Sequence, residues 1–167
     1  MPRTPLTIEQ TLSLLAATPQ RIAAATRGLS PAQLRARPSH DEWSANEVLA
    51  HLRACTDARG KPIITKILTD ERPTLRAVNP RTWIKQTNYV DLDFRTSFRA
   101  FAKERAELLA VLEPLPRKSW SRAATITGAG AVIERTVLTY AQWLALRERP
   151  HVKQIEQIAS AMHGRAR

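Results

Sequence analysis

The stretch that decides the fold spans residues 41–52 and reads DEWSANEVLAHL. Ser44 stands three residues before Glu47, and at this spacing each side chain can hydrogen-bond the other residue's backbone N–H and begin a helix. Apolar side chains then recur at helical spacing, at Val48, Leu49, Leu52 and Cys55. Because glycine and proline interrupt the pattern at Gly60-Lys61-Pro62, we predict an amphipathic helix from Ser44 to about Gly60.

Three further regions repeat this helical periodicity: 7–17, 93–112 and 136–162. After the first, Thr18-Pro19 either begins a second helical piece or kinks one longer helix. In the last region, Thr136 is the expected N-cap of a helix through Arg147. Pro150 is expected to kink or interrupt that helix before it continues from 151 to 162.

The remaining segments are predicted to be connections. Ser30-Pro31 begins a short helical turn through Leu34, and residues 63–68 extend the helical pattern as far as Asp70. Residues 71–92 form a long crossover, and residues 117–135 form a looped excursion or small hairpin around a glycine-rich turn. The sequence therefore predicts one all-α domain over residues 1–167, a four-helix bundle with a long crossover and an excursion before the last helix.

Composition excludes several classes of protein and raises one question. The 167 residues carry 26 Lys+Arg against 15 Asp+Glu, a formal net charge of +11. Cys55 is the only cysteine, which excludes a disulfide framework, and no apolar run approaches the ~20 residues of a membrane span. The chain has no glycine-rich phosphate or dinucleotide motif, and MPRTPLTIEQ at its start is unlike a secretory signal. We therefore expect a cytoplasmic protein without a membrane partner.

Two histidines fall on apolar helical faces and are candidate site residues. His51 lies at the edge of the stripe formed by Val48, Leu52 and Cys55. His151 lies on the stripe of the last helix, with Arg147 one turn before it. A buried imidazole needs a polar partner. One interpretation is that each histidine is satisfied by a backbone carbonyl or a nearby acid in the core. The other is that the two histidines face each other across the bundle. Arg147 either reaches solvent at the bundle mouth or projects into the same pocket, where it could bind a carboxylate or phosphate.

At these residues the sequence resembles the DinB-like proteins, a superfamily that also includes the YfiT-like metalloenzymes. The run from Trp43 to Leu52 resembles the family's W-S-x-x-E-V-L-x-H-L signature. Arg105-Ala-Glu-Leu-Leu109 is similar to an R-x-x-L-L motif of the third helix, and His151-Val-Lys-Gln-Ile155 to the end of the family's site on the last helix. The resemblance spans roughly residues 7–160.

The resemblance implies an up-down-down-up bundle, commonly a homodimer, that binds nickel or zinc through three histidines. His51 and His151 match two of those positions, and the third is occupied by Arg147. Two imidazoles beside a fixed cation make a weak site, because catalytic zinc normally has three protein ligands and like charges repel. Cys55 and Glu148 are possible substitute ligands, although a small buried thiol is usually a packing residue.

Three functional hypotheses follow. In the first, the altered site still binds a divalent metal and supports a hydrolase or a thiol-cofactor transferase or isomerase. In the second, the pocket is free of metal and binds a small acidic ligand through Arg147 and the two histidines. The alternative to both is a structural or stress-related dimer without catalysis.

Weak nucleic-acid binding is a further alternative suggested by the net charge. The basic residues are dispersed rather than clustered, since the longest basic run is Arg117-Lys118, followed by a tail with Arg165 and Arg167. Many arginines stand among acids on helices, as Arg105 does between Glu104 and Glu107. We therefore expect a solvated basic surface that binds nucleic acid only nonspecifically and at low salt.

Overall fold

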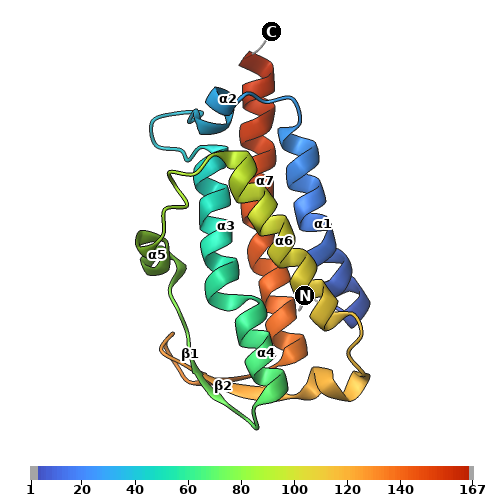
Figure 1. Ribbon diagram of the computed structural model, residues 1–167. Coiled ribbons are helices and arrows are strands. Elements are labelled where there is room, and N and C mark those ends of the chain that lie inside the picture. Colours follow the sequence, from blue (N-terminus) through green and yellow to red (C-terminus); the bar gives the residue numbers. More distant parts are fainter. Residues whose placement is uncertain (1–3, 166–167) are drawn as a thin grey trace.

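A computed structural model describes residues 4–165 and contains four long helices. They are α1 (Ile8–Thr26), α3 (Ala45–Arg59), α6 (Phe94–Leu112) and α7 (Val137–Arg165). In Figure 1, α1 and α7 run in one direction and α3 and α6 in the other, which is the up-down-down-up order. The predicted four-helix bundle is therefore confirmed.

Shorter elements connect the long helices. They are α2 (Pro31–Arg35), α4 (Lys61–Thr69), β1 (Thr74–Arg76), α5 (Pro80–Trp83), η1 (Ile84–Gln86), η2 (Arg117–Ser121), β2 (Ala123–Thr127) and β3 (Ile133–Thr136). The excursion before the last helix is the antiparallel β2–β3 hairpin. The long crossover also contributes β1, which pairs in parallel with β2 and was not predicted. The mostly helical fold thus carries a small three-stranded sheet at one end of the bundle (Figure 1).

Capping interactions begin the helices where the sequence predicts them. Ser44 accepts a hydrogen bond from the Glu47 backbone, and Glu47 accepts one from the Ser44 backbone. Thr136 accepts in the same way from the N–H of Thr139 at the start of α7. At Gly60 the chain passes so close to α3 that a Cβ would lie 2.5 Å from a backbone carbonyl oxygen, so glycine is required where α3 ends and α4 begins.

The two internal prolines lie within continuous helices. α1 is one helix through Pro19, and α7 continues through Pro150 without the predicted interruption. A proline has no N–H, so the carbonyl four residues earlier loses its usual helical donor. For Pro19 that carbonyl belongs to Leu15, and the guanidinium of Arg105 donates to it at 2.8 Å. Packing between helices thus compensates for the missing backbone hydrogen bond.

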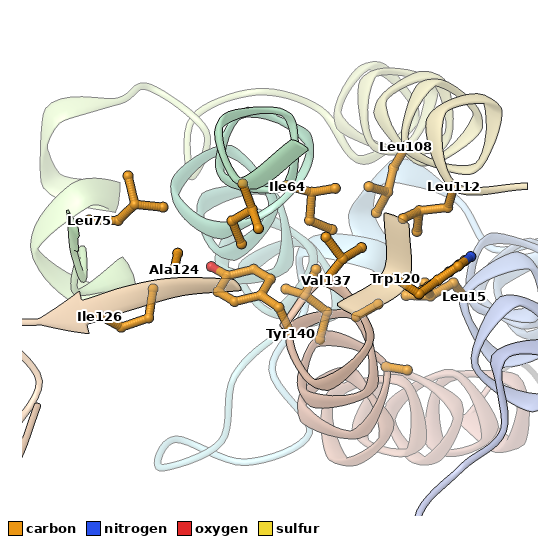
Figure 2. Packing of buried hydrophobic residues seen from close by; sticks show 14 residues of the cluster. Leu15, Ile64, Leu75, Leu108, Leu112, Trp120, Ala124, Ile126, Val137 and Tyr140 are labelled. Carbon is orange, nitrogen blue, oxygen red and sulfur yellow. The ribbon is translucent and has the colours of Figure 1, made fainter. Parts of the chain in front are cut away.

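The interior contains two apolar clusters. Figure 2 shows the cluster at the sheet end, where Trp120, Val137 and Tyr140 pack with apolar residues of α1, α4 and α6. The second cluster joins α2 to the opposite halves of the long helices, around Phe101 and Ile155. Burial of these side chains is the main stabilising contribution to the fold, at roughly 25 cal/mol per Å² of apolar surface.

A buried polar layer separates the two clusters along the bundle. Arg105 is only 2% exposed and pairs with Glu148, which is 6% exposed. Thr18 of α1 donates to the same carboxylate at 3.1 Å. The expectation that Arg105 belongs to a solvated helix face is therefore wrong, because its partner acid lies on another helix and could not be identified from neighbouring residues.

Most of the remaining charge lies at the surface. Exposed pairs such as Arg21–Glu156 and Arg72–Glu134 are scattered over different helices and loops. Arg165 donates to the carbonyl of Pro38, and Arg167 lies outside the described residues. Within residues 4–165, no helix combines the length and the hydropathy that crossing a bilayer requires.

Candidate functional site

A pocket of about 980 Å³ lies between α3, α7, the crossover and the turn of the hairpin. All of the residues singled out from the sequence line it: His51, Cys55, Arg147, Glu148 and His151. α3 and α7 pack side by side, which brings residues that are about 100 positions apart in the chain to one cavity. The predicted convergence of the two histidines therefore agrees with the geometry of the bundle.

His51 and His151 lie against each other in the pocket. Their ring centroids are 4.7 Å apart with the planes inclined by 60°, and Trp43 lies edge-on to His51 at 5.6 Å. Burial lowers the pKa of both imidazoles, and for His51 the value falls to about 4. Both rings are therefore neutral near pH 7, and the Nδ1 atom of His151 is buried without a hydrogen-bond partner.

Arginines surround this histidine pair. Arg81, Arg59 and Arg147 each lower the pKa of His51 further, in addition to burial and the neighbouring His151. Arg147 is itself exposed, so it lies at the mouth of the pocket rather than deep within the bundle. Its guanidinium lies over the ring of Trp143, at 5.8 Å from the centroid. These three cations therefore disfavour a protonated His51.

The arginines come from four different elements. Arg59 lies on α3, Arg76 on β1, Arg81 on α5 and Arg147 on α7, and all four line the pocket. Across the described part of the chain, none of these four forms an ion pair with a carboxylate. Arg59 is held instead by the carbonyl of Val78, to which its Nε donates at 3.1 Å.

Cys55 and Glu148 are poorly suited to replace a missing ligand. The Sγ atom of Cys55 lies 3.5 Å from Nε2 of His51, but burial raises the pKa of the thiol to about 11. Metal ligation needs the thiolate, which this environment disfavours. Glu148 is occupied by Arg105 and Thr18 in the buried polar layer.

The donor set does not fit a divalent metal ion. Among residues 4–165, no group of three or more His, Cys, Asp and Glu side chains could hold a metal ion. The third position expected from the family pattern carries the fixed positive charge of Arg147, and a guanidinium has no lone pair to offer. With two imidazoles alone, the site falls short of the three ligands that catalytic zinc requires.

Sequence reasoning missed most of the cationic lining. Arg59 could have been found, because it stands two turns after His51 on the same helical face. Trp143 could also have been found, one turn before Arg147. Arg76 and Arg81 reach the pocket only through the path of the crossover, for which the sequence offers no local signal. The other two histidines of the sequence, His40 and His163, are both exposed and lie outside the pocket lining.

A second group of titratable side chains lies beside a smaller cavity between α3 and α6. Tyr89 donates to the carboxylate of Asp57, and the guanidinium of Arg53 lies 3.8 Å from the centre of the Tyr89 ring. Burial and the neighbouring Asp57 raise the pKa of Glu104 to about 7. This group of residues is acidic, in contrast to the cationic pocket on the other side of α3.

Comparisons with known proteins agree with this architecture. Residues 14–155 match the family model described as the DinB superfamily. A solved structure of YfiT from Bacillus subtilis superimposes with a TM-score of 0.77 at 19% identity, covering 98% of this chain and 93% of that one. YfiT is described as "a probable metal-dependent hydrolase with an unusual four-helix bundle topology". At this identity the likeness concerns the fold alone. No curated protein matches the chain.

Proposed function

The chain belongs to the DinB superfamily, and on that premise we propose that its bundle pocket binds a small acidic ligand in place of a catalytic divalent metal ion. The observation that carries the proposal is the group of four pocket-lining arginines without carboxylate partners among the described residues. Arginine side chains stay protonated and offer several N–H donors in a fork that matches carboxylate and phosphate oxygens.

The histidines assist binding without acting as metal ligands. A neutral imidazole has one N–H donor and one acceptor, so His51 and His151 can each donate to a ligand oxygen. His151 lines the pocket, and its Nδ1 atom is buried without a hydrogen-bond partner in the part of the chain that the structure describes. Because the arginines supply positive charge and the neutral histidines can supply N–H donors, the pocket is complementary to an anion.

Metal-dependent hydrolysis, as described for YfiT, is not well supported for this chain. That chemistry uses a metal-bound water, and the metal needs three ligand side chains and an open position. Arg147 stands where the family pattern leads one to expect the third ligand, and its charge would repel a divalent cation. The proposal therefore assigns binding to the pocket and no chemical step.

Calorimetric titration with inorganic phosphate at low salt tests the proposal. Arg147→Met removes the charge but keeps the length of the side chain, and we expect about tenfold weaker binding, equivalent to about 1.4 kcal/mol. Arg149→Met is the matched control, because Arg149 is an exposed arginine two residues later that does not line the pocket. Equal losses in the two variants would mean that phosphate binds only to the basic surface, which would contradict the proposal.

A further inference from the structure

Trp143 contacts two of the four arginines that line the pocket, Arg59 and Arg147. The guanidinium carbons of Arg59 and Arg147 lie 5.0 and 5.8 Å from the centroid of its ring, and that of Arg135 lies at 5.1 Å. The negative face of an indole attracts cations, and this attraction holds a guanidinium without occupying its N–H donors with a carboxylate. Trp143 therefore contacts Arg59 and Arg147 without occupying their N–H donors, and of these donors only Nε of Arg59 is used among the described residues, by the carbonyl of Val78.

The positive charge of the pocket lining favours a ligand with more than one negative charge. Arg59, Arg76, Arg81 and Arg147 contribute four positive charges to its lining. The single acid in that lining is Glu148, whose charge is already balanced by Arg105. A monoanion would therefore leave most of the positive charge unbalanced, whereas a dianion or trianion would balance more of it.

Phosphate and carboxylate groups differ in the directions from which they accept hydrogen bonds, and this difference bears on which of them the arginines would bind. The four arginines that line the cavity come from four different elements, α3, β1, α5 and α7. A carboxylate accepts hydrogen bonds mainly in one plane, whereas the terminal oxygens of a phosphate group are arranged tetrahedrally and accept from several directions. The arrangement is better matched to a phosphoryl group.

The size and the apolar wall of the pocket indicate an organic ligand. Its volume of about 980 Å³ lies near the upper end of the roughly 300–1,000 Å³ typical of small-molecule sites. Trp83, Leu144 and Pro150 also line it, and the indole N–H of Trp83 is buried without a partner. An inorganic ion would leave this wall without contacts, whereas the body of an organic molecule could cover it.

From these observations we infer that the ligand is an organic phosphate bearing two or more negative charges, with its phosphoryl group among the arginines and its organic body against the apolar wall. This inference rests on the anion-binding function proposed above. It adds that Trp143 is a positioning residue, which acts through Arg59 and Arg147.

Two probe ligands test the organic-phosphate inference separately from the anion-binding function on which it rests. Calorimetry on the full chain would compare phenyl phosphate with benzoate, which share an aromatic body but differ in charge and in the geometry of the acid. We expect phenyl phosphate to bind at least about tenfold more tightly than either benzoate or inorganic phosphate. If benzoate binds as well as phenyl phosphate and Arg147→Met weakens both, the phosphate assignment fails and the anion site stands. If Arg147→Met and Arg149→Met lose equal affinity for both probes, the anion site itself fails.

Variants of Trp143 test the positioning role. Trp143→Leu removes the aromatic ring and is expected to weaken phenyl phosphate binding about tenfold, whereas Trp143→Phe keeps a ring and should retain most of the affinity. The thermal midpoint of each variant shows whether it is folded. If Trp143→Leu is unstable, Trp143→Met takes its place, because it also removes the ring, and a loss of affinity in a stable Phe variant contradicts the role. Wild-type affinity in a folded Leu variant would contradict it as well.

Discussion

Arg147 and Glu148 are neighbours in the chain but belong to opposite electrostatic environments. Glu148 lies in the buried polar layer, where Arg105 and Thr18 satisfy its carboxylate. Arg147 lies at the mouth of the pocket, where its guanidinium contacts an indole and no acid among the described residues. The buried charge is balanced within the protein, whereas the exposed charge of Arg147 is not paired with a described acid.

This difference follows from solvent access. A charge inside an apolar core is tolerated only when it is paired and hydrogen-bonded, because desolvation is so unfavourable. At the mouth of a cavity, water and an aromatic ring can stabilise a cation until an anion replaces the water. Pairing in the core thus stabilises the fold, and the unpaired arginines of the pocket are the basis of the anion-binding proposal.

The largest effect is expected when the buried pair is broken. Arg105→Met leaves the carboxylate of Glu148 without its cation and should reduce the free energy of unfolding by about 3–5 kcal/mol. Urea denaturation would measure the change. The double variant Arg105→Met/Glu148→Leu removes both charges and should recover a large part of the loss. A single variant as stable as the wild type would contradict the role assigned to this pair.

The second prediction concerns Glu104, in the acidic group beside α3. Its effect on the free energy of unfolding depends on pH and is expected to be smaller. The pKa of Glu104 is raised from 4.5 to about 7 by burial and by Asp57, so the folded state holds this proton more tightly than the unfolded state. The free energy of unfolding should therefore fall as pH rises from 4.5 to about 7. Glu104→Gln cannot ionise and should gain stability relative to the wild type across that range. Parallel denaturation profiles for the two proteins would disprove this expectation.

The exposed ion pair Arg21–Glu156 should contribute less to the free energy of unfolding than the buried pair Arg105–Glu148. Arg21 donates to both oxygens of Glu156 at 2.8 Å, and the two side chains are 44% and 35% exposed. Because water screens this pair, Arg21→Met should cost only about 0.2–1 kcal/mol in the same denaturation assay. A loss as large as that of Arg105→Met would show that burial is not what separates the two pairs.

The smallest effect on stability is expected at the pocket. Arg147 is exposed and forms no ion pair with a described acid, so Arg147→Met should change the free energy of unfolding by less than about 0.5 kcal/mol. Urea denaturation of Arg147→Met and Arg105→Met under the same conditions compares how much the pocket mouth and the buried polar layer contribute to stability. A loss of several kcal/mol would mean that Arg147 supports the fold rather than binding.

The bundle was predictable because its signals are local. The capping box at Ser44 and the apolar stripes lie within single helices, as does the cap at Thr136. The strand at 74–76 was not predicted, since three residues are too few for a pattern and its partner strand lies about 50 residues away. The continuity of α1 also depends on a distant residue, because Arg105 satisfies the carbonyl that Pro19 leaves free.

The histidine pair of the candidate site was predictable from the sequence, but most of the arginines around it were not. His51 and His151 were identified from helical faces and from the family pattern, and they lie in contact. Arg105 was assigned to the surface because its neighbours in the chain are charged, although its partner is on another helix. Arg76 and Arg81 depend on the path of the crossover, which is set by tertiary packing rather than by local preference.

The most direct test of the account is titration of the wild type and Arg147→His with Ni²⁺ and Zn²⁺, with inorganic phosphate as a second ligand. The account predicts that the wild type binds either metal no more tightly than about millimolar, and that the third imidazole tightens metal binding by about a hundredfold or more while weakening phosphate binding. Micromolar metal binding by the wild type, without improvement in Arg147→His, would contradict the claim that an arginine has changed this pocket from a metal site to an anion site.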